Sequence, residues 1–157
     1  MQKIIFNVTP QTHVRATQGD RVFFRIPRER LRPSGLKRLQ RLERYNEYKI
    51  AILSEAKRLN FSIPAQGTCI TFFLPCPKTW SNKKKKLHHF KLHQSKPDLD
   101  NLTKAFLDSL LAEDKAVAHY GELQKRWVNF PLGWIEVTIT KPTEDEYQIP
   151  LSRSGHL

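Results

Sequence analysis

Apolar and polar positions alternate in two different ways along the chain, and together they predict a mixture of strands and helices. β-Branched and aromatic runs over residues 3–9 and 21–26 are typical of strands, and the run TCITFFLP over residues 68–75 is the strongest of them. Apolar residues recur at every third or fourth position over residues 34–60 and again over 101–112. This spacing predicts two helices, each with one buried face.

The last third of the chain completes the predicted sheet. Residues 117–120 are expected to form a short strand, and residues 125–130 and 134–141 a hairpin that turns at Pro131 and Gly133. One long helix between pairs of strands predicts a single α+β (mixed α/β) domain. Its helices are expected to pack mainly on one face of a mixed sheet.

Length and composition are those of one soluble domain. The 157 residues are 39% hydrophobic, enough for a core. No apolar run approaches the roughly 20 residues that cross a bilayer, and the first residues lack the pattern of a signal peptide. A cytoplasmic protein is therefore expected, in which Cys69 and Cys76 remain reduced thiols.

The charge balance points to a polyanionic partner. The chain carries 27 Lys and Arg against 15 Asp and Glu, a formal net charge of +12. Nucleic acid is the first candidate partner and an anionic membrane surface the second, because no amphipathic helix has a bulky apolar face beside a basic one. The basic face of the helix over 34–60 is either a solvated surface or a phosphate-contacting one.

Residues 77–97 are the most basic part of the chain, with seven lysines and no acid. They predict a long exposed basic loop or hairpin. Six of its lysines are candidate DNA contacts: Lys83, Lys84, Lys85, Lys86, Lys91 and Lys96. Three histidines in it, His88, His89 and His93, are expected to be solvated phosphate contacts rather than a zinc site. Trp80 and Phe90 are either anchors of the loop or a wedge between DNA bases.

Five acids gather in the segment KPDLDNLTKAFLDSLLAEDKAV, residues 96–117, of this basic chain. Asp98 and Asp100 would lie about 200° apart on an ideal helix but on one side of an extended segment. Two alternatives follow. Either these acids serve a helix N-terminus, or Asp100 is the N-cap, the helix starts after it, and both carboxylates hold a divalent cation beside a phosphate-binding surface.

The run Asp98-Leu99-Asp100-Asn101-Leu102-Thr103-Lys104, followed by Asp108 and by Glu113-Asp114-Lys115-Ala116-Val117, resembles the motif of the RusA-type Holliday junction resolvases. The resemblance implies a homodimeric endonuclease that acts on branched DNA and depends on Mg²⁺, for which Mn²⁺ can substitute. The endonuclease domain would span residues 1–141, with 77–97 as a basic loop within it and 142–157 as a flexible C-terminal tail.

The family's metal-binding aspartates fall on Asp98, Asp100 and Asp114, and its essential lysine falls on Lys104; these four are the expected catalytic residues. The other motif residues are expected to support the site: Asn101, Asp108 and Glu113. Glu113 departs from the family, which usually has Asp there. With a helix that runs to Ala112, Asp114 would lie about 18 Å from the helix start, so its return to the site requires a tight turn.

The function expected from motif and charge together is resolution of four-way DNA junctions, by paired symmetric phosphodiester cleavage, in recombination and repair. Two alternatives stay open. One is a basic nucleic-acid-binding protein without catalysis, and the other is a metal nuclease that acts on flaps or RNA.

Overall fold

The structure is a computed structural model that describes residues 2–111 and 114–140. Its strands are β1 Gln2–Phe6, β2 Thr68–Pro75, β3 Tyr120–Val128 and β4 Trp134–Ile139. Its α-helices are α1 Pro33–Arg58, α2 Asn82–His88 and α3 Leu99–Leu110. Three short 3₁₀ helices connect them: η1 Gln18–Val22, η2 Arg28–Arg30 and η3 Asp114–Ala116. The predicted tail, residues 142–157, lies outside the described residues.

The four strands form one mixed sheet in the order β1-β4-β2-β3. β4 runs antiparallel to β1 and β2, whereas β3 runs parallel to β2. The predicted hairpin between residues 125–130 and 134–141 is therefore wrong, because β2 lies between β3 and β4. The connection passes so close to β2 that a Cβ on Gly133 would lie 2.0 Å from the Phe73 carbonyl oxygen, so this position requires glycine.

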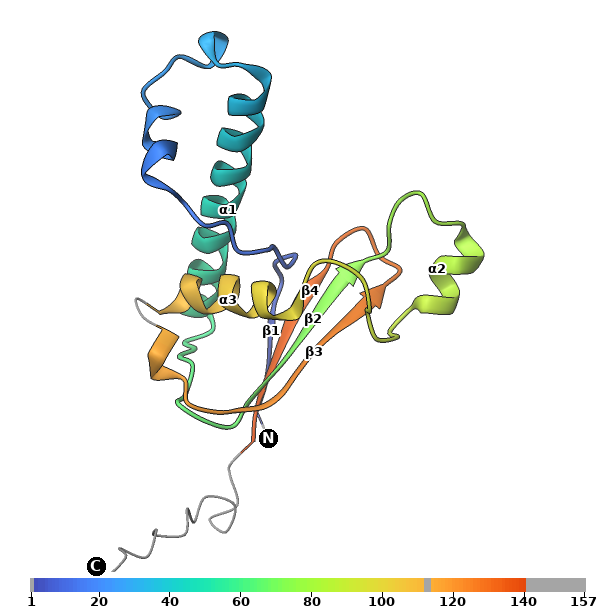
Figure 1. Cartoon of the computed structure of the whole chain (residues 1–157). Helices are drawn as coiled ribbons and strands as arrows, with labels where there is room; N and C mark the ends of the chain where they lie inside the picture. Colours follow the sequence, from blue (N-terminus) through green and yellow to red (C-terminus); the bar gives the residue numbers. More distant parts are fainter. Residues whose placement is uncertain (1, 112–113, 141–157) are drawn as a thin grey trace, which may run out of the picture.

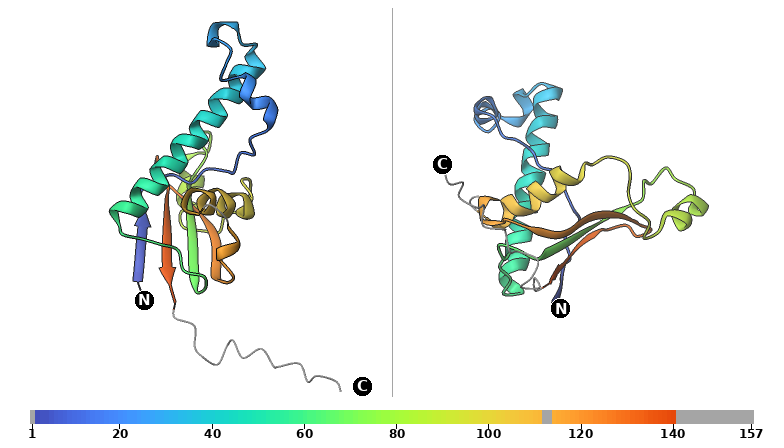
Figure 2. Two further views of the ribbon diagram at one scale, coloured as in Figure 1. Left: turned by 90° about the vertical axis from the view of Figure 1, so that its left-hand side faces the viewer. Right: turned by 60° about the horizontal axis from the view of Figure 1, so that its bottom comes forward.

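Helices α1 and α3 cover one face of the sheet, and the core lies between the two layers (Figures 1 and 2). Alternate residues of β2 point into this core, namely Ile70, Phe72 and Leu74. The buried ring of Phe106 on α3 meets Phe72 edge to face, with ring centroids 6.3 Å apart. These features confirm the predicted α+β class, the mixed sheet and the covering of one face.

The first half of α1 extends away from the sheet, and residues 14–32, which we call the strap, run outward beside it before α1 begins (Figure 1). We call residues 14–44, which include η1 and η2, the arm. The predicted strand over 21–26 is wrong, since these residues end η1 and continue as turns. Val22 and Phe24 are 52% and 58% exposed, and none of residues 21–26 pairs with a described strand.

The predicted basic loop over 77–97, which we call the lysine segment, contains the helix α2. Ser81 caps this helix, and its hydroxyl accepts a hydrogen bond of 3.3 Å from the Lys84 backbone N–H. After α2 the chain runs along β3, where Leu92 forms an isolated antiparallel bridge to Arg126. The segment therefore returns to the sheet before it enters α3. No helix within the described ranges is long and apolar enough to cross a membrane.

Candidate active site

Helix α3 carries the acidic motif, and its apolar stripe fixes where it begins. Leu102 and Phe106 are buried, and Leu99 and Leu110 pack against the same core. The stripe therefore starts at Leu99 and draws this residue into the first helical turn. Asp98 is consequently the N-cap residue and Asp100 lies inside the first turn, so the prediction that Asp100 caps the helix is wrong. The helix starts before Asp100, and not after it as the cation-binding alternative requires.

The carboxylate of Asp98 does not accept the hydrogen bond that an N-cap side chain usually accepts from the first helical turn. Its backbone is extended, with φ −71° and ψ 144°, yet its side chain makes no capping hydrogen bond. Asp98 and Asp100 are both exposed and, within the described residues, neither side chain makes a hydrogen bond or an ion pair. The helix dipole favours negative charge at this end of α3. The two carboxylates are therefore stabilised there without a protein partner among the described residues.

Lys104 lies one turn after Asp100, at the four-residue spacing that puts two side chains on one helix face. It is also exposed, and its ammonium group has no carboxylate partner among the described residues. An ammonium group one turn from Asp100 that no described carboxylate neutralises is available to a phosphate. The start of α3 thus offers oxygen ligands for a hard cation and a positive charge for an anion.

Asp108 lies one further turn along α3 and contacts the chain just before the arm. The Nε2 atom of His13 is 3.1 Å from an Asp108 carboxylate oxygen, and the His13 backbone N–H donates a 3.1 Å hydrogen bond to the Asn101 carbonyl. His13 thereby ties the N-terminal segment to two turns of α3. Sequence reasoning missed His13, because an isolated histidine far from the motif carries no spacing signal.

Tyr45 on α1 borders the same contact. Its ring meets the His13 ring edge to face, with centroids 5.7 Å apart. Burial, followed by the negative charge of Asp108, raises the pKa of Tyr45 to about 12. Tyr45 therefore remains a neutral phenol in the physiological range, and it is part of the packing around Asp108 rather than an acid or base.

Asp114 begins η3, which lies beside the C-terminal end of α3 (Figure 1). Asp98 and Asp100 lie at the other end of this 12-residue helix, about 18 Å away along its axis. The helix ends at Leu110, two residues earlier than predicted, but the side chain of Asp114 and all of Glu113 lie outside the described residues. Within those residues, no three His, Cys, Asp or Glu side chains gather in a way that could hold a metal ion.

Five of the six lysines that were predicted to contact DNA are exposed on the lysine segment. Lys83, Lys84 and Lys86 are exposed on α2, Lys85 is half-buried there, and Lys91 and Lys96 are exposed between α2 and α3. Lys84 holds its ammonium 4.2 Å from the Trp80 ring centroid, and Trp80 in turn contacts Trp127. Trp80 is thus an anchor of the segment, whereas Phe90 is 47% exposed.

The histidines of the lysine segment are not the solvated group that the sequence predicts. His93 is buried and stacks on Trp127 with ring centroids 3.5 Å apart. Burial, followed by the charge of Lys125, lowers its pKa, so this side chain is neutral at neutral pH. A ring nitrogen of His88 contacts the Lys84 carbonyl, and one of His89 accepts from the Asn129 backbone N–H.

Comparison with known proteins identifies the family of this chain. No curated protein matches the chain. The family model of the endodeoxyribonuclease RusA matches residues 26–126, which is more than half of the chain and includes α1, β2, the lysine segment and all of α3. The free carboxylates and the lysine of the D-L-D-N-L-T-K run thus lie within the matched region, and the chain belongs to the RusA endodeoxyribonuclease family.

Proposed function

We propose that this protein is a structure-selective endodeoxyribonuclease that resolves four-way Holliday junctions by paired symmetric cleavage, in DNA recombination and repair. The observation that carries the proposal is the start of α3. There Asp98, Asp100 and Lys104 are exposed and unpaired within the described residues, in a chain that belongs to an endodeoxyribonuclease family.

We infer that Asp98 and Asp100, together with Asp114, hold Mg²⁺, for which Mn²⁺ can substitute. Carboxylate oxygens are the ligands that Mg²⁺ prefers. Asp98, whose backbone is extended, and Asp100, in the first turn of α3, each have an exposed carboxylate without a partner in the described residues. When bound, the ion would supply charge neutralisation of the scissile phosphate and activation of the attacking water. Lys104 would bind a phosphate oxygen and offset the negative charge that develops during cleavage.

Three further motif residues would position these groups. Asp108 holds His13 and thereby fixes the N-terminal segment against α3. The backbone carbonyl of Asn101 accepts a hydrogen bond from the His13 backbone N–H, and Glu113 is proposed to orient the turn that precedes Asp114. None of the three is required to touch the scissile phosphate.

DNA would be held by the lysine segment, which leads directly into the site. Its six candidate lysines, Lys83 to Lys86, Lys91 and Lys96, would contact phosphates of the junction. A homodimer is part of the proposal, since two symmetry-related sites are suited to two symmetric nicks in a substrate with two-fold symmetry.

The test is cleavage of a synthetic four-way junction with Mg²⁺ or with EDTA, by the wild type, by Asp100→Asn and by Glu47→Gln. Glu47 is a matched control, an exposed carboxylate on α1 without a partner in the described residues. Paired nicks that require Mg²⁺ are expected from the wild type and from Glu47→Gln. Asp100→Asn should bind the junction with at least the wild-type affinity and leave it intact.

Two results would overturn the proposal. Binding of the junction without cleavage in Mg²⁺ or Mn²⁺ would identify a nucleic-acid-binding protein without catalysis. Faster cleavage of flaps, linear duplex or RNA than of the junction, with all substrates in competition, would identify a metal nuclease of different selectivity.

A further inference from the structure

The arm, residues 14–44, is a second strongly basic surface, separate from the lysine segment. It carries ten Arg and Lys residues and three acids. Nine of the ten are arginines, whereas the lysine segment has no arginine. The arm and α2 project from the molecule in different directions, and α3 crosses near the base of the arm with its first turn toward α2 (Figures 1 and 2).

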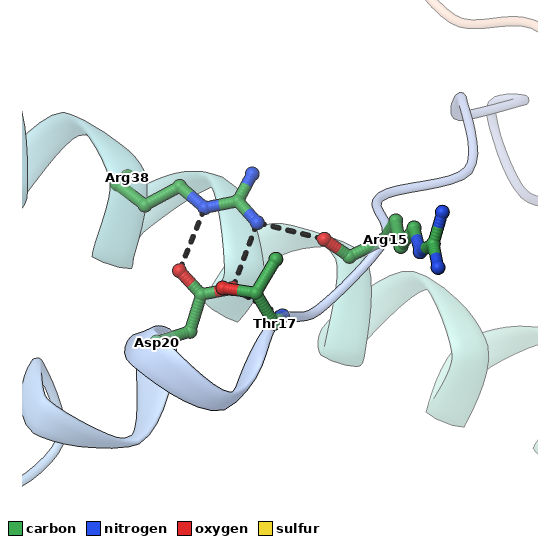
Figure 3. Close-up of polar contacts among 4 residues, drawn as sticks. All are labelled: Arg15, Thr17, Asp20 and Arg38. Atoms are coloured by element: carbon green, nitrogen blue, oxygen red, sulfur yellow. Dashed lines mark hydrogen bonds and ion pairs between the residues drawn. The ribbon is translucent and has the colours of Figure 1, made fainter.

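Two of the arm's three acids serve its internal structure. Asp20 is only 5% exposed and accepts hydrogen bonds of 2.9 and 2.8 Å from the guanidinium of Arg38 on α1. The same Arg38 donates to the Arg15 carbonyl at 2.7 Å, while the side chain of Arg15 points away from this contact (Figure 3). Glu43 on α1 forms an ion pair with Arg28 of η2. The strap is thus fastened to α1 at two points.

These internal contacts leave the outer surface almost purely cationic. A solvated helix face normally intersperses acids with bases at neighbouring positions. Here Glu29 is the one remaining acid of the arm, and six exposed arginines make no ion pair with any described residue. They are Arg15, Arg21, Arg25, Arg30, Arg32 and Arg41. Self-repulsion among them is unfavourable, so such a surface is expected where a polyanion binds.

We propose that the arm binds the phosphate backbone of duplex DNA, independently of the lysine segment. The planar guanidinium presents paired N–H donors that match phosphate oxygens, and the preference for arginine over lysine suits this geometry. An anionic membrane surface fits less well. Val22, Phe24 and Ile26 are the large apolar side chains exposed on the described arm, and they lie on short turns rather than along the apolar face of an amphipathic helix.

This inference rests on the proposed function, since it gives the nuclease a second contact with its substrate. The lysine segment leads into the start of α3, and the arm projects in another direction from the helix that packs on α3 (Figures 1 and 2). DNA bound to the arm and DNA bound to the lysine segment would therefore approach the acidic site from different sides. The diverging helices of a branched substrate suit two surfaces arranged in this way.

The test compares charge-matched pairs of substitutions on the same helix and strap. Arg21→Gln/Arg25→Gln and Arg30→Gln/Arg41→Gln change the arm, whereas Lys57→Gln/Arg58→Gln removes the same charge from the far end of α1. Affinity for a four-way junction is measured in EDTA at several salt concentrations. Each arm pair should lower affinity about tenfold and reduce the dependence of log K on log salt by about two, while the control pair should lower affinity by less than about twofold. Thermal unfolding verifies that every variant is folded.

Equal losses for the arm and control pairs would overturn the inference. So would unchanged DNA affinity combined with loss of binding to anionic phosphatidylglycerol vesicles, which would assign the arm to a membrane surface. If the arm variants bind the junction as tightly as the control pair, and the wild type binds and cuts junctions, only the role of the arm is refuted. A wild type that binds no DNA refutes the proposed function itself.

Discussion

Asp20 and Asp98 are two aspartates in the same basic chain, and folding uses them in opposite ways. The Asp20 carboxylate is nearly buried and accepts hydrogen bonds from the Arg38 guanidinium, the Thr17 backbone and the Thr17 hydroxyl (Figure 3). The Asp98 carboxylate is exposed and accepts none from the described residues. The fold thus depends on the first carboxylate, and the second is free for a ligand.

The largest effect is expected from Asp98→Ala. An ordinary N-cap substitution of this kind costs about 1 kcal/mol of stability, but Asp98 makes no capping bond, and its removal relieves repulsion with Asp100. Junction cleavage should therefore fall on the order of 10²–10³-fold or more with little change in the melting temperature. Full activity with a lower melting temperature would mean that Asp98 stabilises the helix as a cap. Asp98 would then serve the fold, as Asp20 does, and not a ligand.

A smaller effect, on stability instead of cleavage, is expected from Asp20→Asn. The neutral amide has one acceptor oxygen and no charge, so Arg38 loses its bidentate ion pair. The strap then keeps only one of its two ion pairs with α1. The melting temperature should fall by several degrees in a circular dichroism experiment. Glu29→Gln, which removes an arm acid without a described ion pair, is the control, and equal melting temperatures for the two variants would contradict the role given to Asp20.

The pH dependence of this difference is a finer test. Hydrogen bonds from Arg38, then from Thr17, hold the pKa of Asp20 well below its ordinary value of 3.8. A lowered folded-state pKa gives stability that is fully present above 3.8 and is lost as the pH falls further. The difference in melting temperature between wild type and Asp20→Asn should therefore be constant from about pH 7 to pH 5 and should shrink below about pH 4. A difference that grows on acidification would assign the contact to another group.

The smallest effect is expected at two buried threonine hydroxyls, one without a hydrogen-bond partner and one with a partner. The Thr68 hydroxyl is fully buried and has no hydrogen-bond partner among the described residues, whereas the buried Thr103 hydroxyl donates to the Leu99 carbonyl at 2.8 Å. Thr68→Val should leave the free energy of unfolding unchanged or raise it by up to about 1 kcal/mol, and Thr103→Val should lower it by about 1 kcal/mol. Denaturant titration measures both, and a larger loss in Thr68→Val would mean that its hydroxyl is satisfied in solution.

Local patterns predicted most elements of the fold but not their order in the sheet. The run TCITFFLP gives β2 with its exact bounds, and the predicted helix over 34–60 corresponds to Pro33–Arg58. The hairpin failed because adjacency in sequence favours pairing of β3 with β4, whereas β2, buried on both faces at Phe72 and Phe73, takes the central position. Sequence periodicity reports which faces are buried and does not report which strand lies between two others.

The motif predicted where the site lies, and the structure corrected the predicted start of the helix that carries it. Two aspartates suited to capping stand two residues apart, and only the start of the apolar stripe at Leu99 decides between them. His13 could not be found from sequence, because its contacts with Asn101 and Asp108 bridge residues about 90 positions apart. Asp98 and Asp100 lie at the start of α3 and Lys104 lies one turn after Asp100, while Asp114 starts η3 beside the other end of the helix, so the three-carboxylate set remains a prediction.

The place of β4 in the sheet also has a consequence for synthesis of the protein. β1, which leaves the ribosome before the other three described strands, pairs with β4, so that Gln2 lies opposite Ile139 and Phe6 opposite Ile135. A nascent chain that lacks residues 134–139 holds β1 without any partner strand in the described fold and β2 with one edge open. Contacts of such long sequence separation form late and slowly. The described four-stranded sheet is therefore completed only when β4 has been made, and growing chains are exposed until then to proteolysis and to aggregation through their unpaired strands.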